Sequence, residues 1–221
     1  MTIVVSDKSK LTPKQGSDYE IKKIKVNSQR SLTINEINMA KEVFKNSIDY
    51  SKVKIIRGGL LGLPNLSNSA MTPFGKIHLP NQSYNNTKDF GLDSVEATLK
   101  LWYIHEMTHV WQYQLGYSNA VAGINTDING GYTSRALAYD YDLVDKNKKF
   151  NEYNMEQQAE IISHYFDTIY RYSKGHDAVN LHASNIRNKT DLARVLSEFI
   201  VNPSNKELIS KQHGQENYWF D

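Results

Sequence analysis

The stretch Leu101-Trp-Tyr-Ile-His105-Glu106-Met-Thr-His109-Val-Trp-Gln112 decides the fold, because it contains the pattern His-Glu-x-x-His. Residues four apart on a helix lie one turn from each other, so the imidazoles of His105 and His109 can converge on one metal ion. Glu106 lies beside the first histidine and can reach a water molecule on that ion. The stretch therefore predicts a helix with two zinc ligands and a catalytic base, as in zinc metallopeptidases.

The surrounding residues predict that this helix is central. Asp93 to Glu96 has the pattern of a capping box, and Gly116 is a plausible terminator. Apolar residues occupy two faces of the helix, and a helix that is apolar on two sides is buried. These residues are Val95, Leu99 and Trp102 on one face, and Leu101, Ile104 and Trp111 with Thr108 on the other. The alternative is a pair of core histidines that have only structural hydrogen bonds.

A catalytic zinc needs a third protein ligand and an open position for water. The best candidate lies in a second predicted helix, from about residue 151 to 173 and closed by Gly175. We expect Glu156 to be the metal ligand. Glu160 lies one turn later and could accept the N–H of a ligand histidine, which would fix its tautomer. The alternatives are an exchange of the two roles, or a solvated acidic face.

Zinc peptidases often need a hydrogen-bond donor for the oxyanion that develops during the reaction. Candidates in this sequence are Arg135, Tyr139, Tyr141 and His164. His164 lies two turns beyond Glu156 on the same face of the predicted helix. Each of the four also has a structural interpretation, and the sequence does not choose among them.

The rest of the chain predicts a small sheet before the central helix and helices after it. Residues 1–30 are expected to be a loosely ordered segment with a short strand at 22–26. A capping box opens a helix at Ser31–Glu36 that runs to about Ser47. Strands are expected at 50–57 and within 70–80, the latter at an edge where a peptide could add as a strand. Loops are expected at 81–92 and 116–134, and two helices after Thr190.

Composition excludes several classes of protein. The 221 residues carry a net charge of only +2, which does not favour nucleic acid as a partner. The chain has no cysteine, so it has neither a disulfide scaffold nor a thiol nucleophile. No apolar run approaches the length of a membrane span, and the first residues lack the apolar core of a signal peptide. We expect a cytoplasmic location in the producing cell and, if the protein is secreted, a route without a cleaved signal.

With these residues in hand, the chain resembles the small zincin-type metallopeptidases associated with Rhs and Vgr proteins of bacterial type VI secretion. The resemblance covers about residues 31 to 166. It rests on Ser31-Leu-Thr-x-x-Glu36, Ile48-Asp-Tyr-Ser-Lys-Val53, Ala70-Met-Thr-Pro-x-Gly-x-Ile77, Ile104-His-Glu-Met-Thr-His-Val-Trp-Gln112 and Tyr153-Asn-Met-Glu-Gln-Gln-Ala-Glu160. The last segment is also similar to the third-ligand segment of glutamate-type zincins, which implies that Glu156 is a ligand.

The pattern of the elements, together with the zincin-like fold that the resemblance implies, leads us to expect one α+β, zincin-like domain at 31–221. It should have a small and mostly antiparallel sheet, the central helix and a helical carboxy-terminal half. The expected ligands and base predict a Zn²⁺-dependent hydrolase that cleaves amide bonds in proteins or peptidoglycan peptides. The resemblance implies in addition a role as an antibacterial effector. Expected partners are an immunity protein and the secretion apparatus. Two alternatives stay open: a housekeeping processing peptidase, and a non-catalytic metal-containing binding module.

Overall fold

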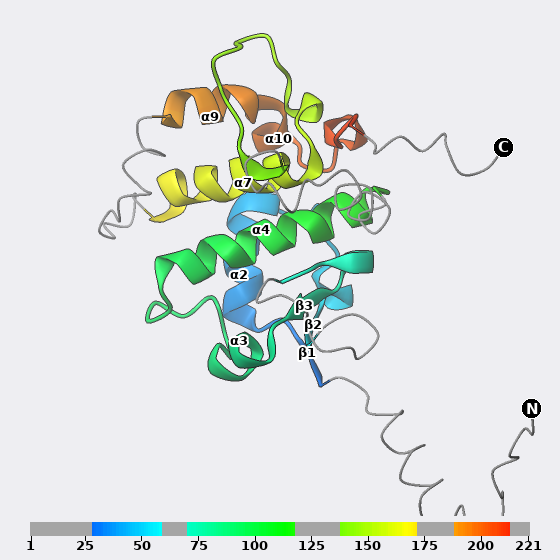
Figure 1. The fold of residues 1–221 in the computed structure, drawn as a ribbon, viewed down its shortest axis with the longest axis vertical. Helices are drawn as coiled ribbons and strands as arrows, with labels where there is room; N and C mark the ends of the chain where they lie inside the picture. Colours follow the sequence, from blue (N-terminus) through cyan, green and yellow to red (C-terminus); the bar gives the residue numbers. More distant parts are fainter. Residues whose placement is uncertain (1–27, 59–69, 118–137, 172–187, 213–221) are drawn as a thin grey trace, which may run out of the picture.

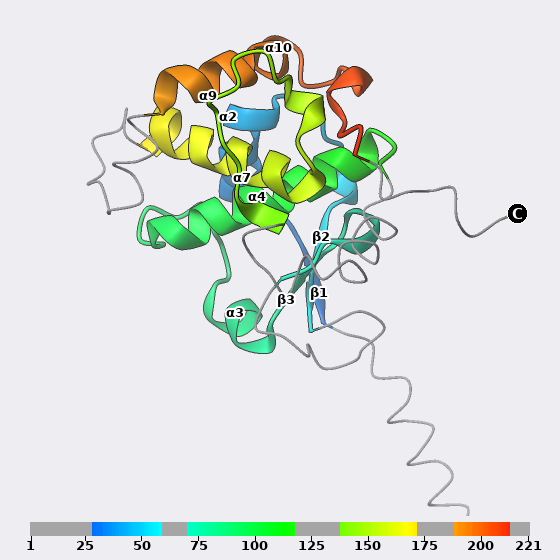
Figure 2. The same ribbon diagram turned by 45° about the horizontal axis from the view of Figure 1, so that its top comes forward.

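Two neighbouring helices, α4 (Ala97–Gln114) and α7 (Met155–Phe166), form the centre of the molecule. The computed structural model describes residues 28–58, 70–117, 138–171 and 188–212. Figure 1 shows α4 and α7 running in opposite directions, with the sheet on one side of the pair and α9 and α10 on the other. Figure 2 shows the same order of layers from a second direction. The α+β class is therefore observed, and the centre lies between two helices.

Helix α4 is the buried helix that the sequence predicts, because every residue from Tyr103 to Gln112 is buried. Its predicted capping box is wrong. The N-cap residue is Glu96 and has no side-chain cap, while Val95 N–H donates to the carbonyl of Leu92 in a turn before the helix. The predicted terminator is confirmed, since Gly116 has φ of 108°, a conformation that favours glycine.

Helix α7 is shorter than predicted. Its N-cap is Asn154, which forms a capping box with Gln157. A separate 3-10 turn, η5 (Phe150–Glu152), precedes it, and the π-helical η6 (Asp167–Arg171) continues it. The proposed end at Gly175 lies outside the described residues.

The sheet consists of β1 (Gln29–Ser31), β2 (Lys54–Arg57) and β3 (Ile77–Leu79) in that order. β1 and β2 are antiparallel, but β2 and β3 are parallel, so this sheet is mixed and not mostly antiparallel. A parallel pair needs a connection of about a dozen residues or more, and the long segment between β2 and β3 provides it. On its outer side, β3 exchanges two backbone hydrogen bonds with Met71.

A buried glutamate ties the sheet to α2 (Ile34–Phe44). Thr33 and Glu36 form the predicted capping box. The carboxylate of Glu36, which is fully buried, also accepts two bonds from the Arg30 guanidinium, at 2.7 and 2.8 Å, and one from Phe90 N–H at 3.0 Å. Helix α2 ends at Phe44, three residues earlier than predicted, because Lys45 has φ of 51°.

The remaining elements cover the helix pair. Trp111 of α4 packs against Phe199 of α10 (Ser197–Val201) with ring centroids 5.3 Å apart, and its indole N–H donates to the carbonyl of Pro203. The other elements are η2 (Tyr50–Lys52), η4 (Pro73–Gly75), α3 (Asn81–Asn86), α9 (Lys189–Val195) and η8 (Lys206–Leu208).

α3 lies where a loop was expected, and β1 begins two residues before the predicted boundary at 31. The segments 22–26 and 118–134 lie outside the described residues. Among the described helices, none combines the length and hydropathy that a bilayer crossing requires.

Candidate metal centre

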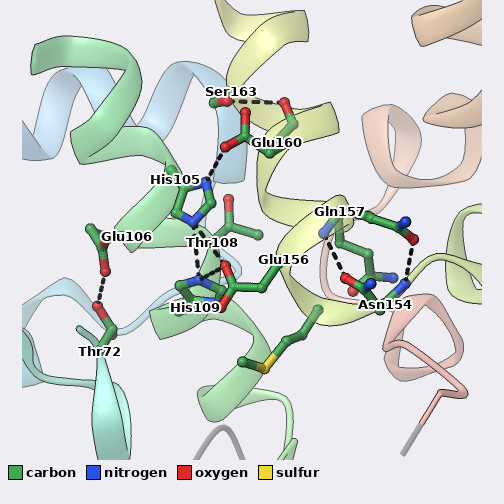
Figure 3. A network of polar contacts seen from close by, with 12 residues as sticks. Thr72, His105, Glu106, Thr108, His109, Asn154, Glu156, Gln157, Glu160 and Ser163 are labelled. Carbon is green, nitrogen blue, oxygen red and sulfur yellow. Dashed lines mark hydrogen bonds and ion pairs between the residues drawn. The ribbon is translucent and has the colours of Figure 1, made fainter. Parts of the chain in front are cut away.

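Three buried side chains from the two central helices converge at one point (Figure 3). Oε2 of Glu156 lies 3.1 Å from Nε2 of His105 and 3.2 Å from Nε2 of His109, and the two Nε2 atoms are 3.3 Å apart. In a tetrahedral zinc site with bonds of about 2.0 Å, neighbouring ligand atoms lie about 3.3 Å apart. The three atoms therefore form a triangle of the size that a zinc ion would need, and the group could hold a metal ion.

The back of His105 is held by a chain of polar side chains. Its Nδ1 lies 3.4 Å from Oε1 of Glu160, whose Oε2 lies 3.2 Å from Nε2 of His164. Nδ1 of His164 lies 2.6 Å from the hydroxyl of Tyr141. Because α4 and α7 run in opposite directions, Glu160 faces His105 and not His109.

The proton positions in this chain follow from burial. Burial raises the pKa of Tyr141, so its hydroxyl keeps its proton and donates to Nδ1 of His164. Burial lowers the pKa of His164 despite the nearby carboxylate of Glu160, so at neutral pH its proton lies on Nε2 and is donated to Glu160. Glu160 can then accept the Nδ1 proton of His105, which leaves Nε2 of His105 for a metal.

The back of His109 is held differently. Its Nδ1 lies 2.9 Å from Oε1 of Gln112, one turn further along the same helix. Gln112 is fully buried. Each histidine thus has its Nδ1 occupied by a polar neighbour and its Nε2 directed at Glu156.

The electrostatics of the triangle favour a positive charge in it. Burial alone would lower the pKa of His105, but hydrogen bonds with Glu156 and Glu160 more than offset this and raise the pKa to about 10. The same competition acts on His109: burial lowers its pKa, but the charge and hydrogen bond of Glu156, together with the charge of Glu106, raise the pKa by more. Burial would raise the pKa of Glu156, but the charge and hydrogen bonds of the two imidazoles lower it. A cation at this position, whether protons or a metal ion, is therefore stabilised.

Glu106 lies next to the triangle and is held by a residue that does not belong to it. Its Oε2 accepts a 2.5 Å hydrogen bond from the hydroxyl of Thr72, and both residues are buried. Thr72 precedes η4, in which Phe74 is 54% exposed and has φ of 54°. Gly75 has φ of 68° and lies against the ring of Tyr113, where an added Cβ would be 2.5 Å from Cδ1.

Three of the four candidate oxyanion donors lie among the described residues, and their contacts differ. The ring of Tyr139 lies beside His105, with centroids 6.0 Å apart. Tyr141 and His164 bond to each other, and His164 also bonds to Glu160, so both belong to the chain behind His105. Arg135 lies outside the described residues.

Sequence reasoning missed three polar residues of the site, Thr72, Gln112 and Gln158. Gln112 could have been found, since it lies three residues after His109 and therefore on the same side of the helix. Thr72 and Gln158 gave no comparable signal, because their contacts depend on how segments distant in the sequence come together.

No family model matches the chain. The chain is 32% identical over 137 residues to the type VI secretion system spike protein VgrG2b of Pseudomonas aeruginosa. The aligned region covers 62% of this chain and 13% of that protein. The chain thus matches only a small part of the length of this relative. Among solved structures it is similar to the effector domain of Pseudomonas aeruginosa VgrG2b, with a TM-score of 0.55 and 27% identity, over 83% of this chain and 91% of that one. Both likenesses support a relationship to Vgr-associated effectors.

Proposed function

We propose that this protein is a zinc-dependent, zincin-like hydrolase of amide bonds that acts as a type VI secretion effector. The observation that carries the proposal is the triangle of donor atoms from His105, His109 and Glu156, with edges of 3.1 to 3.3 Å. The donor set suits zinc, which is bound by imidazole and carboxylate in catalytic sites. The likeness to the VgrG2b effector domain supports the secretion context.

The residues around the triangle have distinct roles in this proposal. A bound Zn²⁺ would lower the pKa of a water molecule toward about 7 and polarise the substrate carbonyl. Glu106 takes the proton of the attacking water on Oε1, because Thr72 holds Oε2. Glu106 then delivers this proton to the leaving amine. Glu160 and Gln112 keep the two imidazoles turned toward the ligand position.

The substrate in this proposal is an amide bond in a protein or in a peptidoglycan peptide of a competing bacterium. An immunity protein would protect the producing cell, and the secretion apparatus would be a second partner. A housekeeping peptidase would have the same site but would not harm cells that express it.

The test measures metal content and activity in the same preparations. Elemental mass spectrometry should find one zinc per chain, lost in Glu156→Ala and reduced in Glu160→Ala. Glu106→Gln should keep the zinc and lose about 100-fold or more of the hydrolysis of a quenched-fluorescence peptide library and of purified peptidoglycan. Expression of the wild type, but not of Glu106→Gln, should stop growth of a susceptible bacterium. A fully active Glu106→Gln protein would contradict the mechanism, and a protein without zinc would favour a binding module.

A further inference from the structure

We propose that two buried glutamines, Gln112 and Gln158, form a relay that fixes His109 in the tautomer able to bind a metal through Nε2. The inference rests on the zinc site of the proposed function and adds the residues that orient its second histidine. Both glutamine side chains are fully buried, so water does not compete for their hydrogen bonds.

The outer glutamine has only one orientation. Nε2 of Gln158 lies 3.0 Å from the carbonyl oxygen of Phe150 and 2.9 Å from that of Leu208. Carbonyl oxygens accept hydrogen bonds and cannot donate them, so the amide nitrogen of Gln158 must face these two groups. Its oxygen, Oε1, is therefore turned toward Gln112.

This orientation determines that of the inner glutamine. Nε2 of Gln112 lies 3.0 Å from Oε1 of Gln158 and 3.0 Å from the carbonyl oxygen of Met155. Both are acceptors, so the nitrogen of Gln112 faces them and its oxygen faces His109. At 2.9 Å from Oε1, Nδ1 of His109 must carry the proton. Nε2, which lies 3.2 Å from Oε2 of Glu156, is then the nitrogen that a metal ion would bind.

The relay differs from the arrangement behind His105. There the partner is a carboxylate, Glu160, whose side chain is 22% exposed. Behind His109 the partner is neutral and buried. It orients the ring without adding negative charge to a site that already contains three carboxylates, those of Glu106, Glu156 and Glu160.

The experiment compares Gln112→Met with Gln114→Met in the full chain. Gln114 lies on the same helix, and its two hydrogen bonds, at 2.7 and 3.2 Å, go to the backbone of Asp49, away from the metal centre. The dissociation constant for Zn²⁺ is measured by competition with a fluorescent chelator. Gln112→Met should weaken zinc binding by about 10- to 100-fold, as loss of an outer partner of a ligand histidine usually does. Gln114→Met should stay within about 2-fold of the wild type.

Gln158→Met tests the outer link, because Gln112 remains but its amide loses the acceptor that orients it. Its zinc affinity should fall between those of the wild type and Gln112→Met. Unchanged affinity in both the Gln112→Met and Gln158→Met variants would overturn the relay.

A measurement on the zinc-loaded wild type keeps the inference testable even if the variants fold poorly. Nitrogen-15 NMR of the imidazoles should find the proton of His109 on Nδ1, and a proton on Nε2 would overturn the relay. If the wild type binds zinc with these properties but hydrolyses no amide, the proposed function fails and the relay stands. If it hydrolyses amides and Gln112→Met binds zinc like the wild type, the relay fails and the function stands.

Discussion

The hydroxyl of Thr72 donates to Oε2 of Glu106 at 2.5 Å, although the two residues are 34 positions apart in the sequence. Figure 3 shows this pair beside the triangle, with Thr72 coming from outside the helix pair. A carboxylate that acts as a base must keep one oxygen directed at its water molecule. Holding the other oxygen is an effective way to restrict the rotation of the Glu106 side chain.

Thr72→Val should therefore lower the rate of hydrolysis while the metal stays bound. The substitution conserves the shape of the side chain and removes its donor. We expect kcat to fall by about 10- to 100-fold because the base is no longer aligned, with little change in KM or zinc content. Steady-state kinetics on the peptide substrate identified with the wild type would measure this. Thr72→Ser keeps the hydroxyl and should restore most of the activity, whereas equal losses in both variants would indicate a packing role.

The stability of the metal-free protein should depend on pH through the triangle. The pKa of His105 is raised from 6.5 to about 10 in the folded state, so its contribution is complete below pH 6.5 and is lost as the pH rises through about 10. The lowered pKa of Glu156 gives a contribution that is present above pH 4.5 and is lost as the pH falls. Urea unfolding in the presence of EDTA should show declining stability between pH 6.5 and 10.

Zinc should reverse this trend, because its binding displaces the protons from the histidines. The apparent affinity for Zn²⁺ should rise with pH over the same range. Calorimetric titrations in two buffers of different ionisation enthalpy would reveal the released protons at pH 7. The same number of protons bound before and after zinc addition would contradict this account.

The buried carboxylate of Glu36 should be important for stability and not for chemistry. Glu36→Gln leaves the guanidinium of Arg30 without its charged partner and weakens the bond to Phe90 N–H. Because the side chain of Arg30 is 19% exposed, we expect a loss of about 2–3 kcal/mol in the free energy of unfolding. Glu42→Gln, at an exposed position on the same helix, should change it by less than about 0.5 kcal/mol. Similar values for both variants in urea unfolding would contradict the assignment.

Phe74 combines a left-handed backbone with an exposed ring, two residues from the contact with the base. Asparagine tolerates this conformation better than phenylalanine, so Phe74→Asn should stabilise the fold by about 0.5–1 kcal/mol. If the ring contacts substrate, the same change should raise KM, and Phe74→Leu should preserve KM without the gain in stability. Thermal unfolding and steady-state kinetics of both variants measure the gain in stability and the change in KM. An unchanged KM in Phe74→Asn would show that the ring does not contact the substrate.

The sequence predicts the central helix well because its information is local. The spacing of His105 and His109, and of Glu156 and Glu160, gives the face on which each residue lies whatever the rest of the fold does. The apolar residues on two faces predict a buried helix, and the structure confirms it, since every residue from Tyr103 to Gln112 is buried.

Other parts of the fold depend on contacts that no local pattern encodes. Helix α3 is short and polar, without buried residues, so it has no apolar periodicity to reveal it. The parallel pairing of β3 depends on the path of a long connection. The orientations of Gln112 and Gln158 follow only from acceptors supplied by distant backbone segments.

The close approach of Gly75 to the ring of Tyr113 limits which residues related sequences can have at position 75. A side chain at position 75 would meet both an unfavourable backbone angle and an aromatic ring. A single mutation there is therefore costly, whereas a smaller residue at 113 would remove only one of the two obstacles. Related sequences should retain glycine at position 75 even where position 113 has a different residue. A related sequence without this glycine should also have a different backbone conformation in the turn that follows Thr72.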